Sequence, residues 1–234
     1  MDVLGDTIAR DRRSDATALR APATGRSYDY RRFCTTAWKM GNFLRYLGVR
    51  AGSGVAIAND PLPEPVLSFY GAALLGGVVR FDPKTSVGDE TRALIVPVDR
   101  LDDYAIGPST KPVVYGDRPA DPSVSYFERD VWSENPTEPP DIVGHDEPCL
   151  STAERTYSHA AVLDAATSVV ERWELEPGDE VAVRGSLAHP GVVAAGLVAP
   201  IVAGAVVVFP DGDTVSDYAV GGGPEPSLDP DDVL

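Results

Sequence analysis

The sequence has 234 residues, of which 43% are hydrophobic, enough for one α/β domain with a sizeable core. Its 36 Asp and Glu residues outnumber its 20 Lys and Arg residues and give a net charge of -16. This balance argues against a nucleic-acid partner and against electrostatic docking on anionic lipid, because both need a basic face. The abundance of Asp and the presence of only three lysines are typical of a halophile's cytoplasmic protein.

The first residues, "MDVLGDTIARDRR", are charged and contain no apolar run, so the sequence predicts no signal peptide. The chain has only two cysteines, Cys34 and Cys149, which make no disulfide framework and fit a reducing compartment. We therefore expect a cytoplasmic protein.

The segment from about 28 to 83 predicts a unit of alternating helices and strands. The apolar residues between Asp29 and Gly48 recur every three or four positions, which predicts a helix. Asp29 can cap its start, and Gly48 suits its end. A strand "VAIA" follows from Val55, then a helix "VLSFYGAALL" to about Leu75 and a strand "VVRF". Residues 84–146 form a diverged linker region, in which "ALIVPV" and "PVVYG" predict short strands.

The segment from about 147 to 210 repeats the plan of the first unit. A helix from about Ser158 leads to a strand "VAV" from Val181. The uncharged run over 191–209 approaches a membrane span in length. Pro200 and Gly204 interrupt it and its end is β-branched, so we expect a helix to about Val202, a glycine turn and a buried strand.

Strand–helix–strand crossovers predict parallel pairing, so the expected fold is α/β, with parallel-type sheet layers and flanking helices. The domain would occupy residues 1–210. Residues 211–234 contain "GGGPEP" and end in "LDPDDVL", which predicts an acidic flexible tail. The acidic pairs and runs along the chain are expected to be solvated surface, with no metal site.

Several segments resemble the amino-terminal part of the adenylate-forming enzymes, the superfamily of AMP-dependent acyl-CoA synthetases and ligases. In the first unit these are "SYDYRRF", "LGVRAGSGVAI" and "FYGAALLGGVVRFDP". In the second unit they are "TYSHAAVLDAA", "LEPGDEVAV", "SLAHPGVVAAGL" and "PIVAGAVVVF". The resemblance implies a truncated acyl-CoA-synthetase-like amino-terminal domain. It implies ATP, AMP, Mg²⁺ and CoA as ligands only if the chain retains the ligase chemistry.

That chemistry depends on a glycine-rich loop with a lysine, whose backbone amides approach the phosphates of ATP. The resemblance places this loop between Leu150 and Ser158. Ser151 and Thr152 match its beginning, and Ser158 and His159 match the residues that follow it. Only "AERTY" stands between them, so we interpret these four residues as a nucleotide-loop remnant and predict no catalytic residue.

His189 matches the segment that lines the acyl pocket in the family, so it is the candidate contact with a small molecule. The alternative is a loop histidine beside Pro190. The sequence also ends before the family's segment that helps to hold Mg²⁺.

The sequence therefore predicts a degenerate, non-catalytic relative that acts as a binding, regulatory or partner protein. Its partner would be another protein or a second copy of the chain. The alternative is one half of a split AMP-dependent ligase that activates a carboxylic acid with ATP. A gene product with no retained role is a third hypothesis.

Overall fold

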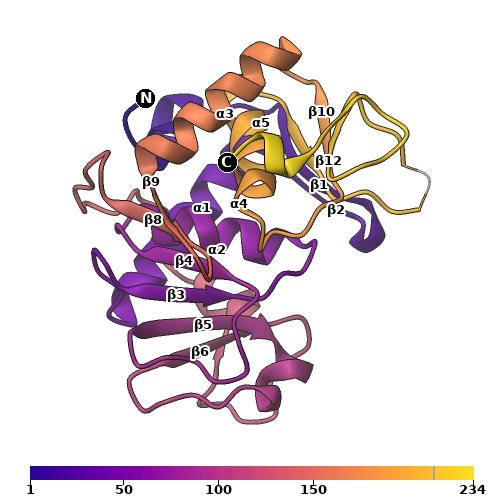
Figure 1. Cartoon of the computed structure of the whole chain (residues 1–234). Helices are drawn as coiled ribbons and strands as arrows, with labels where there is room; N and C mark the ends of the chain where they lie inside the picture. Colours follow the sequence, from indigo (N-terminus) through magenta and orange to yellow (C-terminus); the bar gives the residue numbers. More distant parts are fainter. Residues whose placement is uncertain (213) are drawn as a thin grey trace.

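A computed structural model describes residues 1–212 and 214–234 of the chain (Figure 1). It has two mostly parallel sheets flanked by helices, so the α/β fold predicted from the sequence is confirmed. The two strands predicted in the first sequence unit, over 54–57 and 78–81, lie in the second sheet. The second unit is divided: its strands over 180–183 and 206–208 lie in the first sheet, and those over 148–151 and 156–158 lie in the second.

Each sheet has one antiparallel pair of strands at an edge, Thr17–Ala21 with Arg26–Asp29 in the first sheet and Pro148–Ser151 with Thr156–Ser158 in the second. In spatial order the first sheet is β13 (Ser227–Leu228), β12 (Tyr218–Val220), β10 (Glu180–Val183), β11 (Val206–Val208), β1 (Thr17–Ala21) and β2 (Arg26–Asp29). The second is β7 (Ser125–Tyr126), β6 (Lys111–Tyr115), β5 (Thr91–Pro97), β3 (Gly54–Ile57), β4 (Val78–Phe81), β8 (Pro148–Ser151) and β9 (Thr156–Ser158).

The helices are α1 (Tyr30–Tyr46), α2 (Pro63–Ala73), α3 (His159–Trp173), α4 (Pro190–Val192) and α5 (Ala199–Ala203). They include three long ones, α1, α2 and α3, at the places where the sequence predicts helices. A π-helical stretch over Val193–Val198 joins α4 to α5. As the sequence predicts, the Asp29 carboxylate caps α1, accepting from the Arg32 N–H at 2.6 Å. Gly48 has a φ of 91°, which suits glycine at the end of this helix.

Helices α1, α2 and α4 lie between the strands of the two sheets (Figure 1). The Tyr70 hydroxyl of α2 donates to the Leu197 carbonyl at 3.1 Å, and the Tyr30 hydroxyl of α1 donates to the Ala205 carbonyl at 2.7 Å. Tyr70 is completely buried. These bonds join the two sequence units across one shared apolar core.

The uncharged run over 191–209 forms the expected helix and strand. Helical structure extends to Ala203, Gly204 turns with a φ of 81°, and β11 pairs in parallel with both β10 and β1. Across residues 1–212 and 214–234, no helix is long and apolar enough to cross a membrane.

The segment after residue 210 differs from the predicted flexible tail. In its described part, β12 pairs in parallel with β10 and β13 pairs with β12, which widens the first sheet. The turn between them uses Gly221, Gly222 and Gly223, whose φ values are 87°, 96° and 138°. The glycines that suggested a linker therefore make a turn between two strands.

Candidate functional site

The loop remnant forms a tight hairpin. Strands β8 and β9 are joined by a turn over 152–155, in which the Thr152 N–H donates to the Arg155 carbonyl at 2.8 Å. The Thr152 hydroxyl oxygen accepts from the Glu154 N–H at 3.2 Å and from the Arg155 N–H at 3.1 Å. The turn is thus closed by its own hydrogen bonds.

This closure leaves the turn without a phosphate cradle. Phosphate loops present several free backbone N–H groups to the ligand, usually through glycines. Here three of the turn's amides, at Thr152, Glu154 and Arg155, already have acceptors within the hairpin. Glu154 adds a carboxylate that repels phosphate, and the Arg155 guanidinium lies over the Tyr157 ring at 5.2 Å. The hairpin can therefore fold without binding an anion.

Ser158 and His159 lie at the opposite end of the hairpin from Thr152, because Ser158 pairs with Pro148 whereas Ser151 pairs with Thr156. The Ser158 hydroxyl caps α3, accepting from the Ala161 N–H at 3.2 Å. The His159 side chain is fully buried, and its Nδ1 accepts from the Leu4 N–H at 3.2 Å. The structure does not gather the four remnant residues around one point.

Burial also sets the protonation state of His159. Loss of hydration lowers the pKa of its imidazole from 6.5 to about 4, against the opposing charges of Glu147 and Asp6. The ring is therefore neutral at pH 7. With Nδ1 accepting from Leu4 N–H, the proton resides on Nε2.

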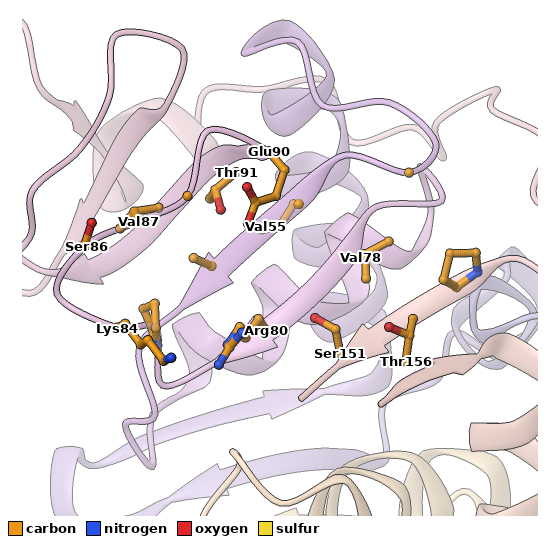
Figure 2. A pocket seen from close by; sticks show the side chains of 16 residues that line it. Val55, Val78, Arg80, Lys84, Ser86, Val87, Glu90, Thr91, Ser151 and Thr156 are labelled. Carbon is orange, nitrogen blue, oxygen red and sulfur yellow. The ribbon is translucent and has the colours of Figure 1, made fainter. Parts of the chain in front are cut away.

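Ser151 and Thr156 line a hollow on the face of the second sheet (Figure 2). Its volume is about 510 Å³. Residues 82–90 connect β4 to β5 without a helix, and parallel strands are usually joined by a helix that covers the sheet. Arg80, Lys84 and Glu90 also line the hollow, and Figure 2 shows the two basic residues toward one end of it and Glu90 toward the other.

A second hollow lies at the carboxyl ends of β3, β10 and β11, where parallel α/β folds usually bind ligands. Its volume is about 520 Å³. Asn59, the second residue after β3, joins the two sheets here. Its amide nitrogen donates to the Ser186 hydroxyl at 2.6 Å, and its oxygen accepts from the Leu187 N–H at 2.7 Å. We call this hollow the carboxyl-edge crevice; it is lined by Asn59, Pro61, Val183, Arg184, Gly185, Ser186, Leu187, Phe209 and Pro210.

Arg184 is the cation of the carboxyl-edge crevice, and it is paired. Its guanidinium donates to the Glu225 carboxylate at 2.6 Å and to the Thr214 carbonyl at 2.8 Å. The Glu225 side chain is only 1% exposed. The segment after residue 210 thus supplies the counter-ion of the one arginine that lines the crevice.

His189, the predicted acyl-pocket residue, is not among the residues that line the carboxyl-edge crevice, although it follows them in the chain. Its Nδ1 accepts from the Gly191 N–H at 3.1 Å and its Nε2 lies 3.0 Å from an Asp231 carboxylate oxygen. Both ring nitrogens are therefore engaged within the chain, and an acyl contact for His189 stays a prediction.

Sequence reasoning missed Asn59, Arg184 and Glu225. The position of Asn59, the second residue after a buried strand, indicates the carboxyl edge of a parallel sheet and could have identified it. Nothing in the sequence indicates that Glu225 returns to Arg184. In the part of the chain that the structure describes, no group of three or more His, Cys, Asp or Glu residues could hold a metal ion.

Comparisons with known proteins identify the fold. Neither a protein-family model nor a curated protein matches the sequence. Among solved structures, the anthranilate CoA ligase AuaEII in complex with anthranoyl-AMP aligns with a TM-score of 0.76 at 20% identity, over 94% of this chain and 49% of that chain. A benzoate CoA ligase from Burkholderia xenovorans LB400 aligns with a TM-score of 0.75 at 18% identity, over 94% and 50%.

A third match is an isolated domain. The N-terminal domain of FACL13 from Mycobacterium tuberculosis aligns with a TM-score of 0.74 at 18% identity, over 91% of this chain and 58% of that chain. This chain therefore has the fold of the amino-terminal domain of AMP-forming acyl-CoA ligases. It spans about half the length of the ligases that it matches.

Proposed function

We propose that the chain is a non-catalytic relative of the acyl-CoA ligases, which acts as a binding, regulatory or partner protein. The observation that carries this proposal is the closed turn over 152–155, in which the Thr152 hydroxyl accepts from two of the amides that a phosphate would need. The transfer of an adenylyl group brings several negative charges together and requires amide and cation contacts at the phosphates. A fold without those contacts does not carry the activity.

The carboxyl-edge crevice supports a retained binding role. It lies at the ligand-binding edge of the fold, and the bonds of Asn59 to Ser186 and Leu187 hold its two walls together. An anionic ligand in this crevice could bind Arg184 only by displacing the carboxylate of Glu225. We therefore expect a neutral or weakly charged ligand, or a protein segment, in preference to a nucleotide triphosphate.

The alternative is one half of a split ligase. It requires a second chain that places phosphate-binding groups against the β8–β9 turn, in addition to the other parts of the site. In this alternative ATP, Mg²⁺ and CoA are ligands of the assembled pair, and the present chain supplies the crevice.

Titration calorimetry of the purified chain tests the proposal. We expect MgATP to show no saturable binding, with any Kd above about 1 mM. Saturable, magnesium-dependent ATP binding with a Kd below about 100 μM would contradict the proposal and favour the split ligase. AMP and octanoyl-CoA are titrated in parallel, and binding of either one without MgATP would assign the chain a small-molecule ligand.

A further inference from the structure

A basic hollow lies against the outer side of the first half of α1. Its volume is about 540 Å³, and it is lined by Arg13, Asp29, Arg31, Arg32, Thr35, Thr36, Lys39 and Trp132. Four of these residues are basic and one is acidic, whereas the whole chain has 36 acidic and 20 basic residues. The lining of the hollow is therefore mostly basic, whereas the chain as a whole is acidic.

Two of the arginines are held in place by aromatic rings. The Arg13 guanidinium carbon lies 5.5 Å from the centre of the Trp38 ring, and that of Arg32 lies 4.6 Å from the centre of the Tyr28 ring. Each guanidinium thus has a ring on one side. The Arg13 Nε is buried without a hydrogen-bond partner, so the Nη groups of Arg13 are the ones that can donate to an anion. Ring contacts thus orient these two cations without neutralising them.

Neither arginine is neutralised by a carboxylate. Across residues 1–212 and 214–234, the Arg13 and Arg32 side chains form no hydrogen bond and no ion pair with the protein. The one acidic residue of the lining, Asp29, is occupied by the Arg32 backbone N–H as the cap of α1. The neighbouring Arg31 does pair with Asp15, at 2.9 Å, but both of these side chains are more than half exposed.

The rim of the hollow carries an aromatic ring. Trp132 is 50% exposed, although large apolar side chains are usually covered. The Lys39 ammonium donates to the Trp132 carbonyl at 2.5 Å, which ties this residue to α1 at the edge of the hollow. An exposed indole beside basic groups offers a stacking surface for a flat ring.

We infer that this hollow binds a small phosphate ester that carries a flat ring. The phosphate lies between the guanidinium groups of Arg13 and Arg32, and the ring stacks on Trp132. Two forked donors and a nearby ammonium suit a dianionic phosphate. The volume suits a small molecule. The hollow includes neither the β8–β9 turn nor the carboxyl-edge crevice, so the inference holds whether or not the chain retains ligase chemistry.

Titration calorimetry with phenyl phosphate tests this inference, with glycerol 3-phosphate as the ester without a ring. We expect saturable binding of phenyl phosphate and weaker binding of glycerol 3-phosphate. Arg32→Gln should weaken the binding of both esters by about tenfold or more, as expected for the loss of a charge-assisted contact. Arg118→Gln removes the same charge at an exposed site outside the hollow and should change both by less than about twofold.

Trp132→Leu tests the ring contact separately. The substitution should weaken the binding of phenyl phosphate by about fivefold or more, because stacking is worth about 1–3 kcal/mol. The binding of glycerol 3-phosphate should stay nearly unchanged. Circular dichroism of each variant confirms that it is folded. The inference is overturned by the absence of saturable phenyl phosphate binding, by equal effects of Arg32→Gln and Arg118→Gln, or by a Trp132→Leu effect that is the same for the two esters.

Discussion

The Thr152 side chain determines what the β8–β9 turn can offer to a ligand. Its hydroxyl oxygen accepts from the Glu154 and Arg155 N–H groups, in the manner of a serine or threonine turn. In a phosphate loop, the oxygens of the bound phosphate accept from backbone N–H groups of this kind. A threonine at this position therefore stabilises an empty turn.

Thr152→Val tests this role, because valine keeps the shape and removes the acceptor. We expect the free energy of unfolding to fall by about 1 kcal/mol, the usual net value of such hydrogen bonds. Urea denaturation measures the change. Thr137→Val, at an exposed residue whose hydroxyl forms no hydrogen bond among the described residues, is the control and should be neutral. Equal effects of the two substitutions would contradict the role of Thr152.

His159 links stability to pH. Burial lowers the pKa of its imidazole to about 4, below the value of 6.5 that it has in the unfolded chain. The unfolded state therefore binds a proton first as the pH falls. The stability that the neutral ring contributes is complete above about pH 6.5 and is lost between about pH 6.5 and pH 4, by up to about 3 kcal/mol.

His159→Asn removes this titration and keeps an acceptor near the position of Nδ1 for the Leu4 N–H. We expect the plot of unfolding free energy against pH to be flatter for this variant between about pH 6.5 and pH 4. Carboxylates titrate in both proteins, so the comparison isolates the histidine. Parallel curves would show that His159 titrates normally in the folded protein.

Among the elements, β12 and β13 lie beside an ion pair between Arg184 and Glu225, and we expect this pair to stabilise their addition to the sheet. The Glu225 carboxylate is 1% exposed and accepts from the Arg184 guanidinium and from the Ser216 N–H. Arg184 in turn follows β10, the strand that pairs with β12. Loss of the Glu225 charge would leave the Arg184 guanidinium, which is 21% exposed, with the Thr214 carbonyl as its remaining partner.

Glu225→Gln should therefore lower the free energy of unfolding by about 2 kcal/mol, the value of a hydrogen bond to a charged group. Its local effect is faster hydrogen exchange at the β12 amides, measured by mass spectrometry. Glu171→Gln, on the exposed side of α3, is the matched control and should change stability by less than about 0.5 kcal/mol. Unchanged exchange in β12 would mean that the strand is held without the ion pair.

The elements differ in how far the sequence predicts them. Helix α1 was predictable because Asp29 and Gly48 mark its ends and its apolar stripe is regular. The strands β3, β4, β10 and β11 were predictable as short apolar runs between turns. Strands β12 and β13 were not, because three glycines and two prolines indicate a linker, and only the distant pairing with β10 makes them strands.

The candidate site was predictable only in part. The missing glycines and lysine are visible in the sequence, but the closure of the turn by Thr152 depends on the register of β8 and β9. The predicted contact of His189 with a ligand overlooked Asp231, which lies 42 residues further along the chain. Such contacts between distant residues have no periodicity or local motif to indicate them.

At the scale of the whole molecule, a net charge of -16 makes the folded state repel itself. The composition led us to expect a protein of a high-salt habitat, and high salt would screen this repulsion. We expect the melting temperature to rise between low salt and about 1 M NaCl, where the Debye length is about 3 Å. A flat or falling melting temperature would contradict this expectation, and sucrose serves as the uncharged control.

Self-association also belongs to the whole molecule. Within the described residues, the exposed large apolar side chains are Met1, Tyr46, Ile106, Trp132, Ile142 and Val215. Multi-angle light scattering in high salt measures the oligomeric state, and a dimer or larger species would make a second copy the partner proposed for this chain.

We propose that this chain, although it has the fold of an acyl-CoA ligase domain, does not activate carboxylic acids. The most direct test is exchange of labelled pyrophosphate into ATP by the purified chain with Mg²⁺ and a panel of carboxylic acids, in high salt. We expect exchange at the level of a mock purification for every acid. Acid-dependent exchange above that level, copurifying with the chain, would contradict the claim and establish adenylation by this protein.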